Sequence, residues 1–353
     1  MSSRVVLVTG RDPLSGMNGM VTYVRAHARA ARAAGFQPHI FCPGETGGVV
    51  EDALATVHRV PVGRWRARYE RTSGGSRTSL FVLDAGPLAR ALARFLDRGP
   101  GATVVHGFGL WAYAATRARA ALSDRGRDLP VIVSYFTTVG DEAAGRVRGS
   151  HPRIAGRARW LLYRFEQAWH RRLLVPLEHR AYRDAHLVLV NYDSVGRLLR
   201  EAYGPGPEIR RVPYTSEAAF TLPPSGRPSA PLAGLSPGDA PLVVSLSRHD
   251  PRKGLSVLLQ ALARLRSAGV PCRAALMSGG ALLAEHRRLA TRLGLDDSTV
   301  LTGWLPDPWT YLQRADVFVL PSLGRAAAPA PSWRPCRPAG PSWPRASTAS
   351  PRT

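Results

Sequence analysis

Lysine is almost absent from this chain of 353 residues. Basic side chains number 48, of which Lys253 is the single lysine and all the others are arginines. This chain uses arginine at nearly every basic position. We therefore expect the one remaining lysine at a position that needs a compact, strongly hydrated ammonium group instead of the planar guanidinium group of arginine. Lys253 is therefore the first candidate for chemistry, and the alternative is that the one lysine simply lies in an exposed turn.

Acidic residues and cysteines are also scarce. Only 25 aspartates and glutamates oppose the basic residues, which leaves a formal charge of +23 and a pI near 11.3. Basic side chains that neutralise phosphates would suit nucleic acid, but the arginines are scattered and accompany no nucleic-acid-binding motif, so we expect no such partner. The cysteines Cys42, Cys272 and Cys336 are too widely separated to indicate a disulfide framework or a metal site.

Long apolar runs are missing as well. No stretch of eighteen apolar residues occurs, so no membrane-spanning helix is expected. Residues Arg4–Thr9 suit a strand and not a signal peptide. Together with a hydrophobic content of 44%, these features predict a cytoplasmic protein with enough residues for two domains.

Short apolar runs alternate with longer segments of helical period along most of the chain. This alternation predicts right-handed crossovers and parallel sheets, hence an α/β protein. We expect two Rossmann-like domains, residues 1–204 and 236–324, joined by a linker at 205–235, with ligand in the cleft at the carboxyl ends of the strands. The expected strands are Val5–Val8, Pro38–Cys42, Thr103–His106, Val131–Tyr135, His186–Val190, Pro241–Ser247, Cys272–Ser278, Thr299–Thr302 and Ala315–Leu320, and the expected helices include Met20–Ala34, Leu255–Ala268 and Ala281–Leu293.

The composition changes abruptly after Gly324. Residues 325–353 contain no Leu, Ile, Val, Asp or Glu and are dominated by Pro, Ala, Ser and Arg, so we expect a disordered tail. The change comes where a further helix and strands should complete the second sheet. Our hypothesis is a frameshift, the alternative is a natural basic tail, and resequencing of the coding region decides between them.

Arg248 and Lys253 lie between a predicted strand and a helix that begins at Gly254. Two cations at the carboxyl end of a strand, beside a helix N-terminus, are typical of a diphosphate clamp, because arginine binds oxygens in a bidentate way and lysine supplies a point charge. Such a clamp suits a nucleotide diphosphate leaving group, whose developing charge has to be stabilised. The alternative is a charged turn in water.

Gly16 and Gly19 lie in a loop between the first predicted strand and the following helix. Glycines there let the backbone approach a ligand, and the helix N-terminus favours an anion. The loop has neither the G-x-G-x-x-G fingerprint nor the P-loop motif. A glycine loop that only makes the turn is the alternative.

Several further segments lead to a family. Together with Arg248–Gly254, the segments Met277–Gly280, Val300–Trp304 and Ala315–Ser322 resemble the C-terminal half of the retaining family-4 nucleotide-sugar glycosyltransferases, which have the two-domain GT-B architecture. The N-terminal glycine loop with the Tyr23 helix, residues Glu178–Asn191, and Arg211–Tyr214 leading to Phe220 fit the same family in the same order. The resemblance covers residues 4–324.

The resemblance implies a nucleotide-sugar donor, transfer with retention, and a sugar, lipid-linked or small-molecule acceptor. It implies no cofactor and no required metal. By the same resemblance Arg248 and Lys253 would hold the donor diphosphate. The other donor-binding residues would be Gly16, Gly19, Gly279, Gly280, Thr302, Gly303 and Trp304, the last three near the nucleotide base.

The chain departs from the family in its acidic residues. The family's glutamate pair, expected just beyond Leu323, has no counterpart, because the aberrant tail begins at Arg325. In the family one of these glutamates faces the reacting sugar and the other holds the ribose, so we expect impaired donor binding and turnover. The alternative function is an inactive remnant or a sugar-nucleotide-binding protein without turnover.

A second departure concerns histidine. Many relatives carry an active-site histidine after a strand of the N-terminal domain, and this chain has Ser134–Gly140 at the matching place, without a histidine. Thr137 and Thr138 in that segment, and His106 at a predicted strand end, are candidates for acceptor or catalytic contact. For His106 the alternative is a hydrogen-bonded structural residue.

Residues Arg157–Arg172 are arginine-rich, aromatic and helical in composition. Such a helix suits an anionic membrane surface, and it would bring the protein to a lipid-linked acceptor at the inner membrane face. The alternative is an ordinary helix with its Trp and Leu side chains in the core and its arginines in water.

Overall fold

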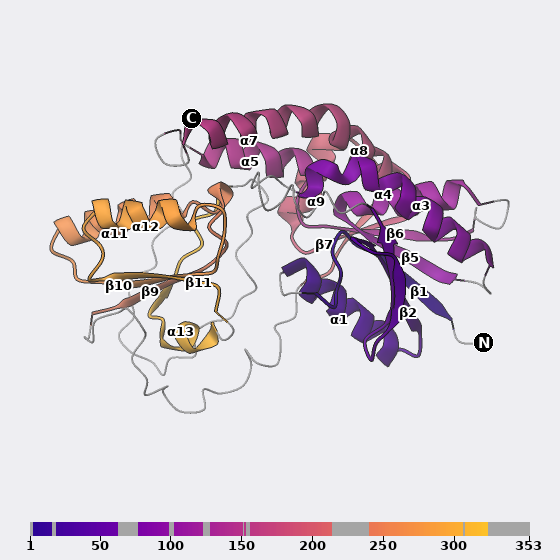
Figure 1. The fold of residues 1–353 in the computed structure, drawn as a ribbon, viewed down its shortest axis with the longest axis horizontal. Coiled ribbons are helices and arrows are strands. Elements are labelled where there is room, and N and C mark those ends of the chain that lie inside the picture. Colours follow the sequence, from indigo (N-terminus) through magenta and orange to yellow (C-terminus); the bar gives the residue numbers. More distant parts are fainter. Residues whose placement is uncertain are drawn as a thin grey trace.

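The computed structural model describes residues 3–15, 19–62, 77–98, 102–122, 128–150, 152, 156–213, 240–305 and 308–323. Predictions on Gly16, on most of the 205–235 linker and on the 325–353 tail lie outside these ranges. The described chain forms two α/β parts, each built on its own sheet (Figure 1). We call residues 3–213 the first domain and residues 240–323 the second domain.

The sheet of the first domain has eight strands in the order β3-β4-β2-β1-β5-β6-β7-β8. All neighbouring pairs are parallel except β3 and β4, which are antiparallel. Successive side chains of β1 point to opposite faces: Leu7 packs in one core cluster, and Val6 and Val8 pack in another. Both faces are therefore buried, as a parallel sheet requires. The strands are β1 (Arg4–Val8), β2 (Gln37–Gly44), β3 (Gly48–Glu51), β4 (Thr56–Pro61), β5 (Ala102–Phe108), β6 (Val131–Tyr135), β7 (Leu187–Val190) and β8 (Glu208–Arg211).

Helices cover both faces of this sheet (Figure 1). The helix α5 begins where the Thr138 hydroxyl accepts a hydrogen bond from the Asp141 N–H at 3.1 Å, an N-cap that satisfies one free donor of the first turn. The helix α7 continues through a π-helical turn into α8. The elements are α1 (Gly19–Ala33), η1 (Arg77–Leu80), α3 (Phe81–Arg98), η2 (Gly109–Trp111), α4 (Ala112–Ala120), α5 (Val139–Gly149), α7 (Arg157–Trp169), the π turn η4 (His170–Leu174), α8 (Val175–Arg183) and α9 (Asp193–Tyr203).

The sheet of the second domain has four parallel strands in the order β11-β10-β9-β12. Two helices, α11 and α12, cover one face, and α13 lies on the other (Figure 1). The strand β9 again feeds both faces, because Val243 packs in the cluster of α11 and Val244 packs with Tyr311 of α13. The elements are β9 (Leu242–Leu246), the 3-10 turn η5 (Pro251–Lys253), α11 (Leu255–Ser267), β10 (Arg273–Met277), α12 (Leu283–Arg292), β11 (Thr299–Gly303), α13 (Trp309–Arg314) and β12 (Val317–Phe318).

The predicted α/β class with two Rossmann-like parts is confirmed. Three strands were not predicted, namely β3, β4 and β8; of these, β3 and β8 lie at the two edges of the sheet and have mostly exposed side chains, so they lack a buried apolar run. The strand expected at Ala315–Leu320 is shorter, because only Val317 and Phe318 pair with β9. Among the helices in the described ranges, none has the length and hydrophobicity that a membrane crossing requires.

Candidate active site

The carboxyl ends of β9, β10 and β11 bring together the predicted donor-binding residues of the second domain. In the parallel register Leu246 lies opposite Met277, and Met277 lies opposite Gly303. The loops that follow are hydrogen-bonded to one another: the His249 N–H donates to the Gly279 carbonyl at 2.9 Å, and the Ser278 N–H donates to the Gly303 carbonyl at 2.8 Å. Arg248, the two glycines after β10 and the Thr302–Trp304 segment therefore share one edge of the sheet, as the strand-end rule predicts.

Two glycines at this edge are required by their surroundings. Gly280 has φ +150°, and a Cβ atom there would lie 2.6 Å from the backbone N and O of His249. Gly254, which follows η5, has φ +64°, and its Cβ atom would lie 2.1 Å from the Pro321 carbonyl oxygen. No other residue fits either position without moving backbone, so these glycines allow the loops to pack tightly around the cations.

Lys253 does not stand free in water. Its side chain is half-buried, whereas Arg248 is exposed. Burial lowers the pKa of the Lys253 ammonium, and the charges of Arg252 and Arg248 lower it further. The carboxylates of Asp250 and Glu142 offset part of this repulsion. The remaining excess of positive charge favours a negatively charged ligand.

The chain beyond β12 returns to the same turn. The Leu323 N–H donates to the Arg252 carbonyl at 2.7 Å. Leu323 therefore lies directly beside the Arg248–Lys253 turn, although about seventy positions separate Leu323 from Arg252 in the sequence. The resemblance places the family's glutamate pair just after Leu323, outside the described residues.

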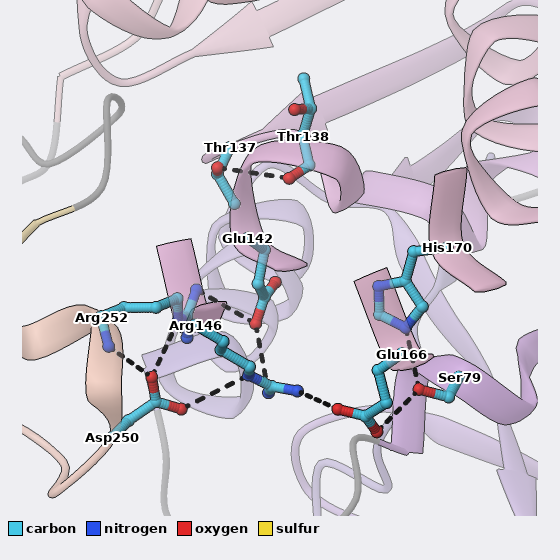
Figure 2. A network of polar contacts seen from close by, with 9 residues as sticks. All are labelled: Ser79, Thr137, Thr138, Glu142, Arg146, Glu166, His170, Asp250 and Arg252. Carbon is cyan, nitrogen blue, oxygen red and sulfur yellow. Dashed lines mark hydrogen bonds and ion pairs between the residues drawn. The ribbon is translucent and has the colours of Figure 1, made fainter. Parts of the chain in front are cut away.

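Thr137 and Thr138 lie after the carboxyl end of β6. Thr138 is buried and caps α5, and the Thr137 hydroxyl donates to the Thr138 carbonyl at 3.4 Å (Figure 2). Just behind them the carboxylate of Glu178 accepts hydrogen bonds from the Val139 N–H at 2.8 Å and from the Tyr203 hydroxyl. Through the hydrogen bond from Val139, this carboxyl group supports the start of α5 from inside the core. Burial raises the pKa of Glu178 to about 7.

His106 lies inside the domain and not at a strand end. It is two residues before the end of β5, so the predicted position is wrong: β5 runs on through Phe108 because His106 and Phe108 both stay in register with β6. Its side chain is 5% exposed, and its Nε2 atom is 2.8 Å from the Ser134 hydroxyl. Burial and the nearby His27 lower the pKa of His106 to about 3. These contacts fit the hydrogen-bonded structural alternative.

Gly19 begins α1 and is exposed, with open space where a side chain would stand. A glycine that sequence reasoning missed lies just upstream: a Cβ atom on Gly10 would lie 2.1 Å from the Trp111 ring. Gly10 therefore lets Trp111 pack near the end of β1. The sequence feature that could have indicated this close contact is the position of Gly10 just after the first predicted strand.

Sequence reasoning also missed the charged residues that join the two domains. Arg146 of α5 pairs with Asp250, and Glu142 of α5 pairs with Arg252 (Figure 2). Glu166 of α7 pairs with Arg146 from the other side. In an arginine-rich chain, charged residues within a helix indicate a helix face that is exposed to water. The one feature of the sequence that pointed to this network was Asp250, an acidic residue among the three cations Arg248, Arg252 and Lys253.

The two parallel-sheet domains, with the candidate site at the carboxyl edge of the second, define the GT-B class of glycosyltransferase fold. A glycosyl transferase 4-like domain matches residues 18–215, and a glycosyl transferases group 1 domain matches residues 231–328. Because the first match covers more than half of the chain, the protein belongs to the glycosyl transferase 4-like family.

Solved structures show the same fold. Sucrose-phosphate synthase from Thermosynechococcus elongatus matches with a TM-score of 0.64 at 18% identity, over 91% of this chain and 76% of that chain. HepE from Anabaena, solved in complex with UDP-glucose, matches with a TM-score of 0.54 at 13% identity, over 89% of this chain and 72% of that chain.

Curated relatives match a shorter region. The GDP-mannose-dependent alpha-(1-6)-phosphatidylinositol monomannoside mannosyltransferase of Mycolicibacterium smegmatis is 38% identical over 92 residues, which are 26% of this chain and 24% of that protein. The lipopolysaccharide core biosynthesis glycosyltransferase LpsE of Rhizobium meliloti is 36% identical over 87 residues, 25% and 24% of the two chains. The chain therefore spans about a quarter of the length of the curated relatives it matches.

Proposed function

We propose that this protein binds a nucleotide-diphosphate sugar and transfers the sugar to an acceptor with retention. The observation that carries the proposal is the Arg248–Lys253 turn, whose cations lie at the carboxyl edge of the second sheet beside the Gly279–Gly280 loop. The family membership and the relatives named for GDP-mannose and solved with UDP-glucose support a donor of this class.

The turn suits the charge changes of such a transfer. When the bond from the sugar to the diphosphate breaks, negative charge grows on the leaving phosphate oxygen. Arg248 and Lys253 would stabilise that charge in place, because both cations are already held at the sheet edge. Trp304, whose side chain is 65% exposed at the end of β11, would offer a face to the nucleotide base. Since two cations neutralise the diphosphate, we propose that no metal or other cofactor is required.

The test is a calorimetric titration of the full chain with GDP-mannose and UDP-glucose. We expect binding of at least one donor, and we expect Lys253→Met to weaken it by about 2 kcal/mol, or about 30-fold. Arg264→Met removes an exposed cation of α11 in the same domain and should leave the affinity unchanged. If neither donor binds, or if both variants weaken binding equally, the proposal is wrong.

A binding protein without turnover is the second candidate, and a specific observation favours it. The chain beside Arg252 leads at Leu323 into a tail that contains no acidic residue. Under the first proposal the missing glutamates reduce turnover, and under the second they abolish it. Release of free sugar or formation of a glycosylated product, measured with a radiolabelled donor that the titration has shown to bind, separates the two.

We further propose that α7 places the protein on an anionic membrane, at the inner face, where a lipid-linked acceptor is available. Leu161, Phe165 and Trp169 are spaced four residues apart on one side of α7, with exposed fractions of 58%, 65% and 37%. Exposed arginines that stand beside this apolar stripe supply the positive charge that anionic lipid attracts. They are Arg157, Arg164, Arg171 and Arg172.

Co-sedimentation with vesicles tests the membrane contact. We expect the full chain to bind phosphatidylglycerol-containing vesicles at low salt, and Leu161→Ser with Phe165→Ser to abolish binding. Val257→Ser with Val270→Ser removes two apolar side chains that are 50% and 48% exposed on the second domain, and it should have no effect. Equal binding of all three proteins would show that the stripe is not a membrane contact.

A further inference from the structure

The C-terminal half of α5 lies directly against the turn η5 of the other domain. A Cβ atom on Gly149 would lie 2.0 Å from the Pro251 carbonyl oxygen, and one on Gly145 would lie 3.2 Å from Cγ of Arg252. The two glycines are four residues apart and share one face of the helix. This face therefore brings the backbone of the first domain into contact with the turn that carries Lys253.

Ion pairs cross the domain boundary at the same place (Figure 2). Arg146 Nε lies 3.6 Å from Asp250 Oδ2, and Arg252 Nη1 lies 3.1 Å from Glu142 Oε1. Arg146 also faces Glu166 at 3.3 Å, so carboxylates and guanidinium groups of the two domains alternate. The side chains of Arg146 and Asp250 are only 11% and 13% exposed, which makes each charge dependent on its partners.

Asp250 serves both the turn and the boundary. Its Oδ1 accepts hydrogen bonds from the backbone N–H and from Nε–H of Arg252, each at 3.1 Å, while its Oδ2 faces Arg146. The Lys253 N–H donates to the Asp250 carbonyl at 2.9 Å. One carboxylate thus shapes the turn that presents Lys253 and also binds it to the first domain.

A second cross-domain contact holds the neighbouring donor loop. Arg159 of α7 donates to the Ala281 carbonyl at 2.9 Å and forms an ion pair with Glu285. Ala281 directly follows Gly280, whose backbone packs against His249. Two of the three loops at this edge, those after β9 and β10, are therefore held from the first domain.

We infer that Asp250 and Arg252 are positioning residues, and that their ion pairs with Arg146 and Glu142 form a latch that aligns the donor-binding edge with the first domain. The inference rests on the proposed function, because it concerns the same diphosphate clamp. Buried ion pairs contribute little net stability compared with apolar packing, but removal of one partner leaves an uncompensated buried charge. The pairs therefore favour the arrangement of the domains in which each charge keeps its partner.

The latch also keeps like charges together. Arg248, Arg252 and Lys253 lie within six positions, and Asp250 and Glu142 compensate their repulsion before a diphosphate arrives. Loss of either carboxylate, or of the arginine that holds it, lets the turn relax. Because coupling between two sites is reciprocal, donor binding in turn stabilises the latched arrangement of the domains.

A double-mutant cycle tests this with GDP and UDP as probes, titrated calorimetrically into the full chain. Arg146→Met removes the cation from the first domain, and Asp250→Asn keeps the acceptor for the turn while removing the charge. We expect each variant to weaken nucleotide binding about tenfold, or about 1.4 kcal/mol, and the double variant to be no weaker than the singles. Arg146→Lys, which keeps the charge without the fork, should recover only part of the affinity.

The exposed pair of Arg266 and Asp297 provides the matched control, with side chains 48% and 62% exposed in the same domain. Arg266→Met should leave nucleotide affinity unchanged. If Arg146→Met lowers only the melting temperature and changes the affinity less than twofold, or if the two single effects add, the latch does not position the clamp.

Small-angle scattering separates failure of the latch from failure of the proposed function. If the wild-type chain binds neither nucleotide, the proposed function is wrong, and the latch is then tested by the radius of gyration alone. We expect Arg146→Met to increase it, because the domains separate, while Arg266→Met does not. An unchanged radius of gyration would overturn the latch.

Discussion

Glu178 predicts an unusual pH dependence of folding stability. Its carboxyl group is 2% exposed, and burial raises its pKa from 4.5 to about 7 despite the hydrogen bonds from Val139 and Tyr203. Between these two pH values the folded chain keeps the proton and the unfolded chain loses it. The stability contributed by this group is therefore complete below pH 4.5 and is lost as the pH rises through 7. The difference of about 2.5 pH units corresponds to about 3 kcal/mol.

Glu178→Gln tests this value, because glutamine has the shape of the protonated acid and does not titrate. The difference in free energy of unfolding between variant and wild type should change by about 3 kcal/mol in favour of the variant between pH 4.5 and pH 8. Urea unfolding at both pH values measures it. Glu208→Gln, at a side chain 62% exposed, should show no such change. A constant separation of the Glu178→Gln and wild-type curves would refute the argument.

Three further predictions concern packing and charge. Gly149→Ala should drive the domains apart and lower the melting temperature, because its Cβ atom would lie 2.0 Å from the Pro251 carbonyl oxygen. Gly86→Ala in α3 should be tolerated, and thermal melts of the two variants test the difference. Burial lowers the pKa values of the adjacent His249 and His286 to about 4, so stability should fall as the pH drops from 6.5 through 4, and His286→Gln should flatten that fall in urea unfolding. Leu259→Ala, at a fully buried side chain of α11, should cost about 2–5 kcal/mol of unfolding free energy.

The local pattern predicted much of the architecture and the sheet edge at which three loops meet. Buried parallel strands are continuous apolar runs, and their carboxyl ends meet at one edge, so the loops after β9, β10 and β11 were expected to converge. The same rule made Arg248 and Lys253 candidate site residues, and their role stays a prediction. Edge strands such as β3 and β8 were missed, because a strand that buries few side chains has no distinctive period.

Charged residues were harder to interpret. Glu142 and Arg146 are four residues apart on α5, which is the pattern of an exposed helical pair. Nothing in the local sequence shows that Asp250, about a hundred positions later, takes the place of water beside them. The apolar run around His106 was recognised as a strand, but its end was not, because the length of β5 depends on its pairing with β6.

Four features could be recognised from the sequence alone, because composition and hydrophobic period are local properties. They are the single lysine, the paired cations after a strand, the α/β alternation and the absence of acidic residues after Gly324. Only the tertiary structure decided which charges are buried and which partners they have. It placed Leu323 beside the Arg252 turn and brought α5 against that turn, since both contacts join segments far apart in the chain. Lys253 therefore lies in a turn of the second domain that α5 of the first domain contacts.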